Sequence, residues 1–271
     1  MNCRIVVITI DEPIYTVPLI EVVIKRFRDH IKLVTALSPL KEKNLTPRTS
    51  GNPFLVIVTR LKYYGPKNFS KFGAIYIFLK LLDFLHHIGI TKRPFSIPSI
   101  LEKYKIQNMA CPHNDINNLE YIKSLRRIDP DIILCNFSQI AGKEFLDIAR
   151  LGCLNVHYSL LPKNKGREPL FWTLLNDDHP GVTIYKMDKK VDCGNIIAKK
   201  KFSLEGVYTL HSAIKRAHEV SARLLIDTLE DIINKGKLEI QSGDNNLESV
   251  YNKWPNREDV YRFRRKGFSF I

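Results

Sequence analysis

The sequence lacks any paired arrangement of cysteines. Its five cysteines are spread over 271 residues, with no C-x-x-C and no Cys/His spacing that would form a zinc site. An odd number of scattered cysteines also argues against a disulfide framework, so we expect a reduced, cytoplasmic setting. The opening residues, MNCRIVVITIDEP, have too few basic residues and acids too early for a signal peptide. We predict no resident metal.

Long apolar runs without charge are absent as well. The nearest candidate, residues 72–90, is interrupted by Lys80, Asp83, His86 and His87, so we do not expect a membrane-spanning helix. We interpret the two histidines as part of a polar or interfacial helix face rather than as a metal site.

Acidic residues are scarce beside the basic ones. There are 42 Lys and Arg against 28 Asp and Glu, which gives a net charge of +14. This excess permits an anionic partner but does not by itself choose one. The hydrophobic share of 44% and the charged share of 26% are ordinary for globular proteins and exclude a disordered chain.

Short β-branched runs alternate with helical patterns along the chain, as in parallel βαβ units. Strands are predicted at Ile5–Thr9, Ile31–Leu37, Phe54–Thr59, Ile106–Met109, Ile132–Cys135 and Leu154–His157, with a long helix at Tyr208–Asn234. We therefore predict an α/β fold with a mostly parallel, Rossmann-like sheet and flanking helices. The expected domains are a catalytic domain at 1–236, with a helical insertion at about 40–97, and a short C-terminal extension at 237–271.

The segment from Arg60 to Pro98 is both basic and aromatic. Its apolar residues recur at helical spacing from Ala74 to Ile88, which predicts a helix with a wide apolar face. That face needs a partner, because an exposed apolar stripe promotes aggregation. Three partners are open: the protein's own core, which we favour, then a second copy of the chain, then a membrane surface. We expect a homodimer.

Three chemically capable residues lie late in the chain. Asn155 and His157 are two apart on a predicted strand, so their side chains project from the same face. Asp192 falls on a turn between strands predicted at Gly181–Met187 and Asn195–Lys199. An Asn amide donates to a developing oxyanion, a His moves a proton near neutral pH, and a carboxylate orients the imidazole. With no G-x-S-x-G motif, the pattern favours acyl or formyl transfer by direct attack of a substrate amine.

The string NVHYSLLPKNKGREPLFW, followed by GVTIYKMDKKVDCGNII, resembles the 10-formyltetrahydrofolate-dependent formyltransferases. That family carries Asn-x-His-x-Ser-Leu-Leu-Pro and then a G-V-T segment leading to Asp-x-Gly. The resemblance implies a formyltransferase that uses 10-formyltetrahydrofolate as co-substrate, with Asn155, His157 and Asp192 as its catalytic residues.

The resemblance also implies where the ligands bind. PDIILCNFSQI looks like the family strand and loop that grips the pterin. The expected cofactor-binding residues are Cys135, Asn136, Phe137, Ser138, Gln139, Ile140, Asp188 and Asp192. The expected substrate-binding residues are Ser159, Lys163, Lys165 and Arg167.

Among the members of this family, the chain most resembles the sugar N-formyltransferases. The residues after Asn234 are too few for the additional C-terminal domain of methionyl-tRNA formyltransferases. Asp11-Glu12-Pro13 follows the first strand where glycinamide ribonucleotide transformylases carry a Gly-rich phosphate loop. We therefore expect transfer to the amino group of a nucleotide-activated amino sugar.

Alternatives to this acceptor stay open. The amine could belong to a lipid-linked amino sugar or to an aminoacyl-tRNA, although nucleic acid is not the partner we favour. A non-catalytic module that only binds folate is the alternative from another functional class. All three catalytic residue types are intact, which favours the enzyme.

Overall fold

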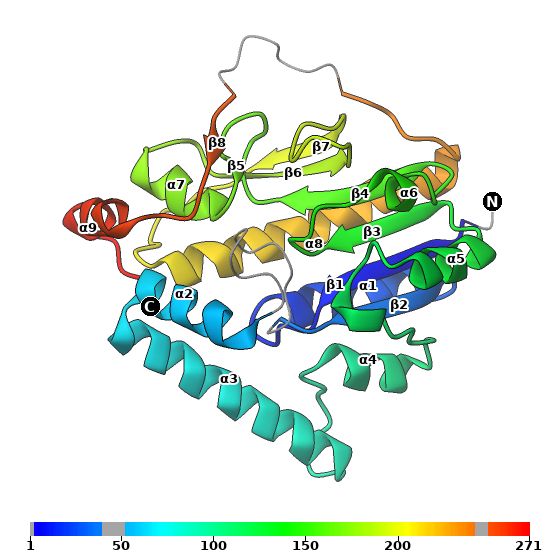
Figure 1. Ribbon diagram of the computed structural model, residues 1–271, viewed down its shortest axis with the longest axis horizontal. Coiled ribbons are helices and arrows are strands. Elements are labelled where there is room, and N and C mark those ends of the chain that lie inside the picture. The colour runs from blue at the N-terminus through cyan, green and yellow to red at the C-terminus, as the bar shows by residue number, and fades with distance from the viewer. Residues whose placement is uncertain (1–2, 40–51, 242–248) are drawn as a thin grey trace. The chain divides into compact units, whose positions relative to one another are not determined.

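The computed structural model describes residues 3–39, 52–241 and 249–271 (Figure 1). The chain divides into two compact units, Met1–Cys153 and Leu154–Ile271. The domains expected at 1–236 and 237–271 remain a prediction, and residues 40–51 of the expected insertion lie outside the described residues.

The first unit is built on three parallel strands, β1 (Ile5–Ile10), β2 (Ile31–Leu37) and β3 (Ile132–Asn136). β1 lies in the centre and pairs with both neighbours. Nearly every residue of β1 and β3 is buried, which explains why these strands are continuous apolar runs without alternation.

Helices of the first unit begin and end at recognisable signals. α1 (Thr16–Phe27) buries Val17, Ile20 and Val23 along one face, as helical spacing requires. α5 (Leu119–Ile128) begins where the Asn118 side chain accepts a hydrogen bond from the Tyr121 amide, at 3.1 Å. This unit also contains α4 (Ile97–Tyr104), a short 3-10 helix at Pro112–Asn114 and α6 (Lys143–Leu146).

Two long helices follow residue 52, where a strand and then a helix were expected. α2 (Pro53–Tyr64) replaces the strand predicted at Phe54–Thr59. The apolar run permits either structure, and Asn52 decides it locally: its side chain accepts from the Phe54 amide and caps a helix with proline at its first position. α3 (Pro66–His87) agrees with the predicted helix, but none of its residues is buried. The expectation that the core covers its apolar face is therefore wrong.

The second unit carries antiparallel strands. β4 (Gly152–His157) runs from the end of the first unit into the second and pairs with β6 (Gly181–Lys186), which pairs in turn with β7 (Ile196–Lys201). Two short strands, β5 (Lys165–Gly166) and β8 (Tyr251–Asn252), pair in parallel. The pairing ties the C-terminal region to the loop that follows β4.

Three helices complete the second unit. α8 (Leu210–Lys235) begins at a Thr209 cap, ends at Gly236 in the left-handed conformation, and contacts β6 and β7. α7 (Pro169–Leu175) contacts α9 (Arg257–Arg265). Phe171 of α7 stacks on Phe263 of α9, with ring centroids 4.6 Å apart, and both side chains are buried.

The predicted α/β fold with a mostly parallel, helix-flanked sheet is confirmed, and the sheet is mixed because β4, β6 and β7 pair antiparallel. The strand expected at Ile106–Met109 is wrong, since only Asn108 forms an isolated bridge, to Val34. Within residues 3–39, 52–241 and 249–271, none of the helices is both long and apolar enough to cross a bilayer.

Asp131 joins the start of β1 to the end of the first unit. Its carboxylate accepts from the Arg4 amide at 2.8 Å and from Arg150 Nε at 2.7 Å. Burial alone would raise the pKa of Asp131, but these bonds hold it below its usual value. The carboxylate therefore stabilises the fold fully above the unfolded-state pKa, about 4, and the contribution is lost as pH falls through the lower folded-state pKa.

We expect Asp131→Asn to lower the free energy of unfolding by about 1–3 kcal/mol at neutral pH, because the charged acceptor is lost. The loss of stability below about pH 4 should also become less steep. Asp129→Asn is the matched control, since Asp129 pairs with Arg4 at an exposed position and should cost about 0.5 kcal/mol or less. Urea unfolding at several pH values measures both. Equal effects of the two variants would contradict the role given to Asp131.

Candidate active site

Strand β4 positions the first two residues of the site. Asn155 and His157 stand two apart on it, and His157 is buried. The Asn155 side chain is held by two bonds: its carbonyl oxygen accepts from the Val156 amide at 2.8 Å, and its amide nitrogen donates to the Tyr185 hydroxyl at 3.0 Å. The nitrogen carries two hydrogens, and Tyr185 takes one of them.

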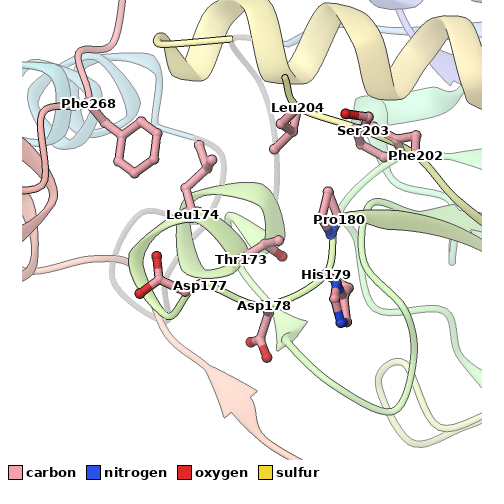
Figure 2. A pocket seen from close by; sticks show the side chains of 10 residues that line it. All are labelled: Thr173, Leu174, Asp177, Asp178, His179, Pro180, Phe202, Ser203, Leu204 and Phe268. Atoms are coloured by element: carbon pink, nitrogen blue, oxygen red, sulfur yellow. The ribbon is translucent and has the colours of Figure 1, made fainter. Parts of the chain in front are cut away.

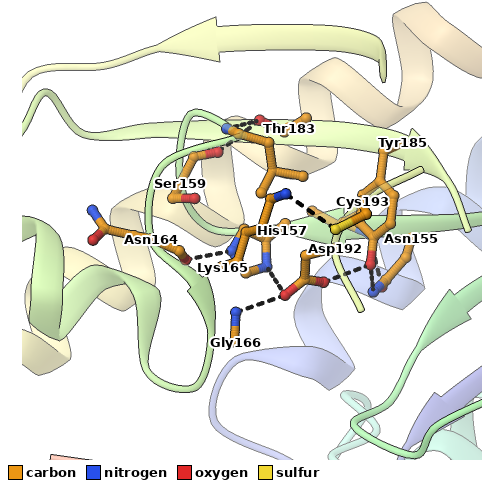
Figure 3. A network of polar contacts seen from close by, with 12 residues as sticks. Asn155, His157, Ser159, Asn164, Lys165, Gly166, Thr183, Tyr185, Asp192 and Cys193 are labelled. Carbon is orange, nitrogen blue, oxygen red and sulfur yellow. Dashed lines mark hydrogen bonds and ion pairs between the residues drawn. The ribbon is translucent and has the colours of Figure 1, made fainter. Parts of the chain in front are cut away.

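Asp192 lies on the turn between β6 and β7, with its carboxylate buried. Its backbone is left-handed, with φ of +50°, a conformation that Asp tolerates better than most residues. One carboxylate oxygen accepts from the Gly166 amide and the other from the Tyr185 hydroxyl, each at 2.7 Å (Figure 3). Tyr185 therefore bridges Asp192 and Asn155 through a single hydroxyl group.

The bonds of His157 indicate which ring nitrogen carries its proton. Nε2 lies 2.8 Å from the carbonyl oxygen of Asn164, and because a carbonyl only accepts, Nε2 donates. Nδ1 faces the Asp192 carboxylate at 3.7 Å, which is within ion-pair range but too long for a hydrogen bond (Figure 3). In neutral His157, Nδ1 is thus the nitrogen that accepts a proton, and the resulting cation faces a buried carboxylate.

Asn164 holds the other side of the imidazole and is itself buried in polar contacts. Its amide nitrogen donates to Thr173 Oγ1 and Asp178 Oδ2, and its side-chain oxygen accepts from Asn252 at 2.9 Å. Asn252 belongs to β8, so a residue of the expected C-terminal extension supports the site. Sequence reasoning missed Tyr185, Asn164 and Asn252, because nothing in their local pattern marks them.

The loop after β4 is closed by hydroxyl groups. The Ser159 hydroxyl donates to the Lys163 carbonyl at 2.7 Å, and Thr183 Oγ1 donates to the Ser159 carbonyl and accepts from the Leu161 amide. Ser159, expected to bind substrate, is buried and bonds within its own loop. The Thr of the G-V-T segment thus fastens this loop to β6.

The cations expected at the substrate have partners nearby. Lys163 pairs with Asp178 at 2.8 Å, and Lys165 Nζ lies 3.1 Å from the exposed Cys193 thiol (Figure 3). The backbone of Arg167 is also held, since its N–H donates to the Asn252 carbonyl. Asp188 is exposed and accepts from the Lys189 amide.

The expected pterin loop, residues 135–140, belongs to the first unit. Cys135 is fully buried, and burial raises the pKa of its thiol. Gln139 folds the loop, since its side chain accepts from the Ile116 amide and donates to the Asn114 carbonyl. Three further contacts hold the loop. The Asn136 side chain donates to the Thr9 hydroxyl, and the Phe137 ring packs edge-on against Phe145. The Asn117 side chain donates to the carbonyl of Ile140, whose own side chain is exposed. The half-buried Ser138 completes it.

Glu12 occupies the start of α1. Its carboxylate accepts from the amides of Ile14, Tyr15 and Thr16, at 2.8, 2.8 and 3.2 Å. Burial raises the pKa of Glu12, although these three bonds act in the opposite direction. Backbone donors of the kind that hold a phosphate are therefore present, but a side-chain carboxylate already uses them.

A cavity of about 420 Å³ lies elsewhere in the second unit (Figure 2). It is lined by Thr173, Leu174, Asp177, Asp178, His179, Pro180, Phe202, Ser203, Leu204 and Phe268. None of Asn155, His157 and Asp192 lines it, but Thr173 and Asp178, which accept from the Asn164 side chain, do. No group of three or more His, Cys, Asp or Glu in the described part of the chain could hold a metal ion.

The sequence matches the Formyl transferase family over residues 92–229, about half of the chain. It is similar to the methionyl-tRNA formyltransferase of Thermotoga maritima, with 34% identity over 169 residues, 62% of this chain and 53% of the relative. The methionyl-tRNA formyltransferase of Borrelia garinii subsp. bavariensis is 33% identical over 187 residues, 63% of this chain and 58% of the relative. The chain thus spans about half the length of these curated relatives.

Solved structures share the fold at low identity. A sugar N-formyltransferase from Shewanella sp FDAARGOS_354 matches with a TM-score of 0.54 and 15% identity, covering 97% of this chain and 87% of that one. A phosphoribosylglycinamide formyltransferase from Anaplasma phagocytophilum matches with a TM-score of 0.58 and 15% identity, covering 93% and 100%. These likenesses concern the architecture alone.

The turn that carries Asp192 requires glycine at position 194. A Cβ there would lie 1.7 Å from the Lys186 carbonyl oxygen, which is backbone and cannot rotate away. We expect Gly194→Ala to lower the free energy of unfolding by about 2–3 kcal/mol and to displace Asp192. Gly73→Ala is the control, because Gly73 lies within α3 with no atom near its Cβ position; it should leave stability unchanged or raise it by up to about 1 kcal/mol. Thermal and urea unfolding measure both, and a neutral Gly194→Ala would contradict the close packing of this turn.

Proposed function

This chain belongs to the Formyl transferase family, and we propose from that premise that it transfers a formyl group from 10-formyltetrahydrofolate to the primary amine of an anionic acceptor. The observation that carries the proposal is a polar network in which Tyr185 bridges Asn155 and Asp192, and the Asp192 carboxylate faces His157. These three residues are the positions at which the family motif places its catalytic groups.

In the proposed reaction, the acceptor amine attacks the formyl carbon directly. A new C–N bond forms, the carbonyl oxygen takes up negative charge, and the bond from the formyl carbon to the folate nitrogen then breaks. Asn155 donates the second hydrogen of its amide to that oxygen. His157 takes the amine proton at Nδ1 and returns it to the departing folate nitrogen.

Asp192 supports His157 in this scheme. The buried carboxylate faces Nδ1 of the imidazole at 3.7 Å, so its negative charge lies opposite the cation that forms when His157 takes the amine proton. Because Gly166 and Tyr185 already donate to Asp192, the carboxylate remains oriented while the charge on His157 changes. We therefore assign to Asp192 the electrostatic and positioning role, and to Tyr185 the role of a positioning residue.

We place the pterin against the backbone of residues 135–140, with Asp188 as a further contact. In support, side-chain contacts to residues outside the loop hold it in place. Gln139 donates to the Asn114 carbonyl, the Phe137 ring packs against Phe145, and Asn117 donates to the Ile140 carbonyl. The basic residues Lys163, Lys165 and Arg167 remain the proposed contacts of the acceptor's phosphates, although Lys163 would have to exchange Asp178 for this ligand.

Two acceptors are the main candidates. The curated relatives at 33–34% identity are named methionyl-tRNA formyltransferases, which favours methionyl-tRNA. The first choice from the sequence is a nucleotide-linked amino sugar. Because the Glu12 carboxylate already accepts from the amides at the start of α1, we do not place a phosphate of either acceptor there. Both acceptors are anionic, so the net charge of +14 does not choose between them. A lipid-linked amino sugar is a further acceptor for the same amine chemistry.

The deciding experiment supplies 10-formyltetrahydrofolate and a panel of amines to the purified protein. We expect release of tetrahydrofolate, together with formylated product identified by mass spectrometry, from methionyl-tRNA or from one nucleotide amino sugar. Glycinamide ribonucleotide should not be formylated. Binding of folate without turnover of any acceptor would contradict the enzyme and favour a folate-binding module.

Three variants test the roles within the network. His157→Ala should lower kcat by about 10²–10⁴-fold, and Asn155→Ala by about 10²–10³-fold, as for a lost acid–base group and a lost oxyanion donor. Tyr185→Phe keeps the ring but leaves Asn155 and Asp192 unbridged, so we expect a smaller loss, on the order of tenfold in kcat with little change in KM. Tyr261→Phe, at an exposed tyrosine on α9, is the matched control and should behave as wild type.

Near wild-type turnover of His157→Ala or Asn155→Ala would contradict the mechanism. A Tyr185→Phe variant that changes KM alone would contradict its positioning role. Circular dichroism and melting temperature establish that each variant is folded before its rate is interpreted.

A further inference from the structure

The segment from Phe54 to Ile90 contributes half of the exposed large apolar side chains among the residues that the structure describes. It contains the α2–α3 hairpin, which we define as residues 53–87. The two helices are held together by aromatic contacts, including Tyr64 against Phe72 at 4.8 Å between ring centroids. In Figure 1 the hairpin is drawn in cyan.

The outward side of α3 is apolar over most of its length. Its exposed large apolar residues recur at helical spacing and are 52–69% exposed: Ile77, Phe78, Leu81, Phe84 and, just past its end, Ile88 at 54%. In α2, Phe54, Ile57 and Leu61 repeat the pattern with the same spacing. A surface of this kind is typical of a binding face rather than of scattered exposed residues.

The opposite side of α3 is fastened to the first unit by polar contacts. Lys80 pairs with Asp11 at 3.0 Å, and Asp83 accepts from the Phe95 amide at 2.8 Å. The Asp11 carboxylate also accepts from the Ile97 amide. These contacts set the orientation of α3, so the apolar stripe faces away from the body of its own unit.

All exposed charge on this part of the chain is positive. Between residues 52 and 97 the sole acid is Asp83, which is engaged on the inner side. The exposed cations stand at both ends of the apolar stripe: Lys62, Lys67 and Lys71 at one end, and Lys92 and Arg93 at the other. The face therefore complements a partner that is apolar in its interior and anionic at its surface.

We infer that the α2–α3 hairpin docks onto the surface of a lipid bilayer that contains anionic lipids. The apolar stripe would enter the boundary between headgroups and acyl chains, with the helices parallel to the membrane plane. The flanking lysines and arginine would pair with anionic headgroups. This inference does not depend on the proposed formyl transfer.

A second copy of the chain fits the same face less well. In a two-fold contact between antiparallel α3 helices, Lys67 and Lys71 of one copy would lie beside Lys92 and Arg93 of the other. Like charges brought together at an interface oppose association, and this segment has no exposed acid to compensate. An anionic lipid surface meets both the charge and the apolar stripe.

Vesicle flotation tests the inference with the whole protein. The protein should float with vesicles of phosphatidylglycerol and phosphatidylcholine at low salt, float less at high salt, and not float with phosphatidylcholine alone. Ile77→Glu combined with Leu81→Glu removes apolar contact, and Lys67→Glu combined with Lys71→Glu reverses charge. Each pair should lower binding to the anionic vesicles on the order of tenfold.

Matched controls carry the same changes at other exposed positions. Leu119→Glu on α5 should bind like wild type, as should Lys215→Glu with Arg216→Glu on α8. The inference is overturned if the wild type does not float with anionic vesicles, or if the hairpin variants bind no worse than the controls. It is also overturned if light scattering shows a dimer that Ile77→Glu with Leu81→Glu dissociates, since a second copy would then cover the face.

Discussion

The Asp192 carboxylate is buried, and a buried charge destabilises a protein unless hydrogen bonds replace the lost water. Two donors from different segments meet this need, the Gly166 amide of β5 and the Tyr185 hydroxyl of β6. Because neither donor is near Asp192 unless the loop after β4 and the β6–β7 turn are both in place, satisfying this one side chain fixes the geometry of the second unit's polar network. Gly194 permits the turn by its lack of a Cβ.

The same constraint prepares His157 for proton transfer. Its Nε2–H is committed to the Asn164 carbonyl, so its basic nitrogen faces the satisfied carboxylate. Asn164 is in turn held by Asn252 of β8, which links the C-terminal region to the imidazole through two side chains. The orientation of this imidazole thus depends on segments that lie nearly a hundred residues apart in the sequence.

In the first unit a side-chain carboxylate is also held by hydrogen-bond donors, but there it occupies a possible binding site. Glu12 satisfies the free amides at the start of α1 with a side-chain carboxylate, which leaves this helix end without donors for an external anion. The α2–α3 hairpin is the converse case, since Lys80 and Asp83 of α3 are engaged on the inner side while an apolar stripe faces outward. The start of α1 thus offers no site for an external anion, whereas the outer face of α3 presents exposed apolar side chains.

The sequence by itself determined the elements whose signal is local. Buried strands such as the one predicted at Ile5–Thr9 are read from their apolar runs, the period of two places Asn155 and His157 on one face, and the long motif identifies the family. Tertiary structure alone decided the rest. Tyr185, Asn164 and Asn252 acquire their roles only when distant segments pair. Hydrogen-bond partners and burial depend on which segments meet in space, and no periodicity along the chain records that.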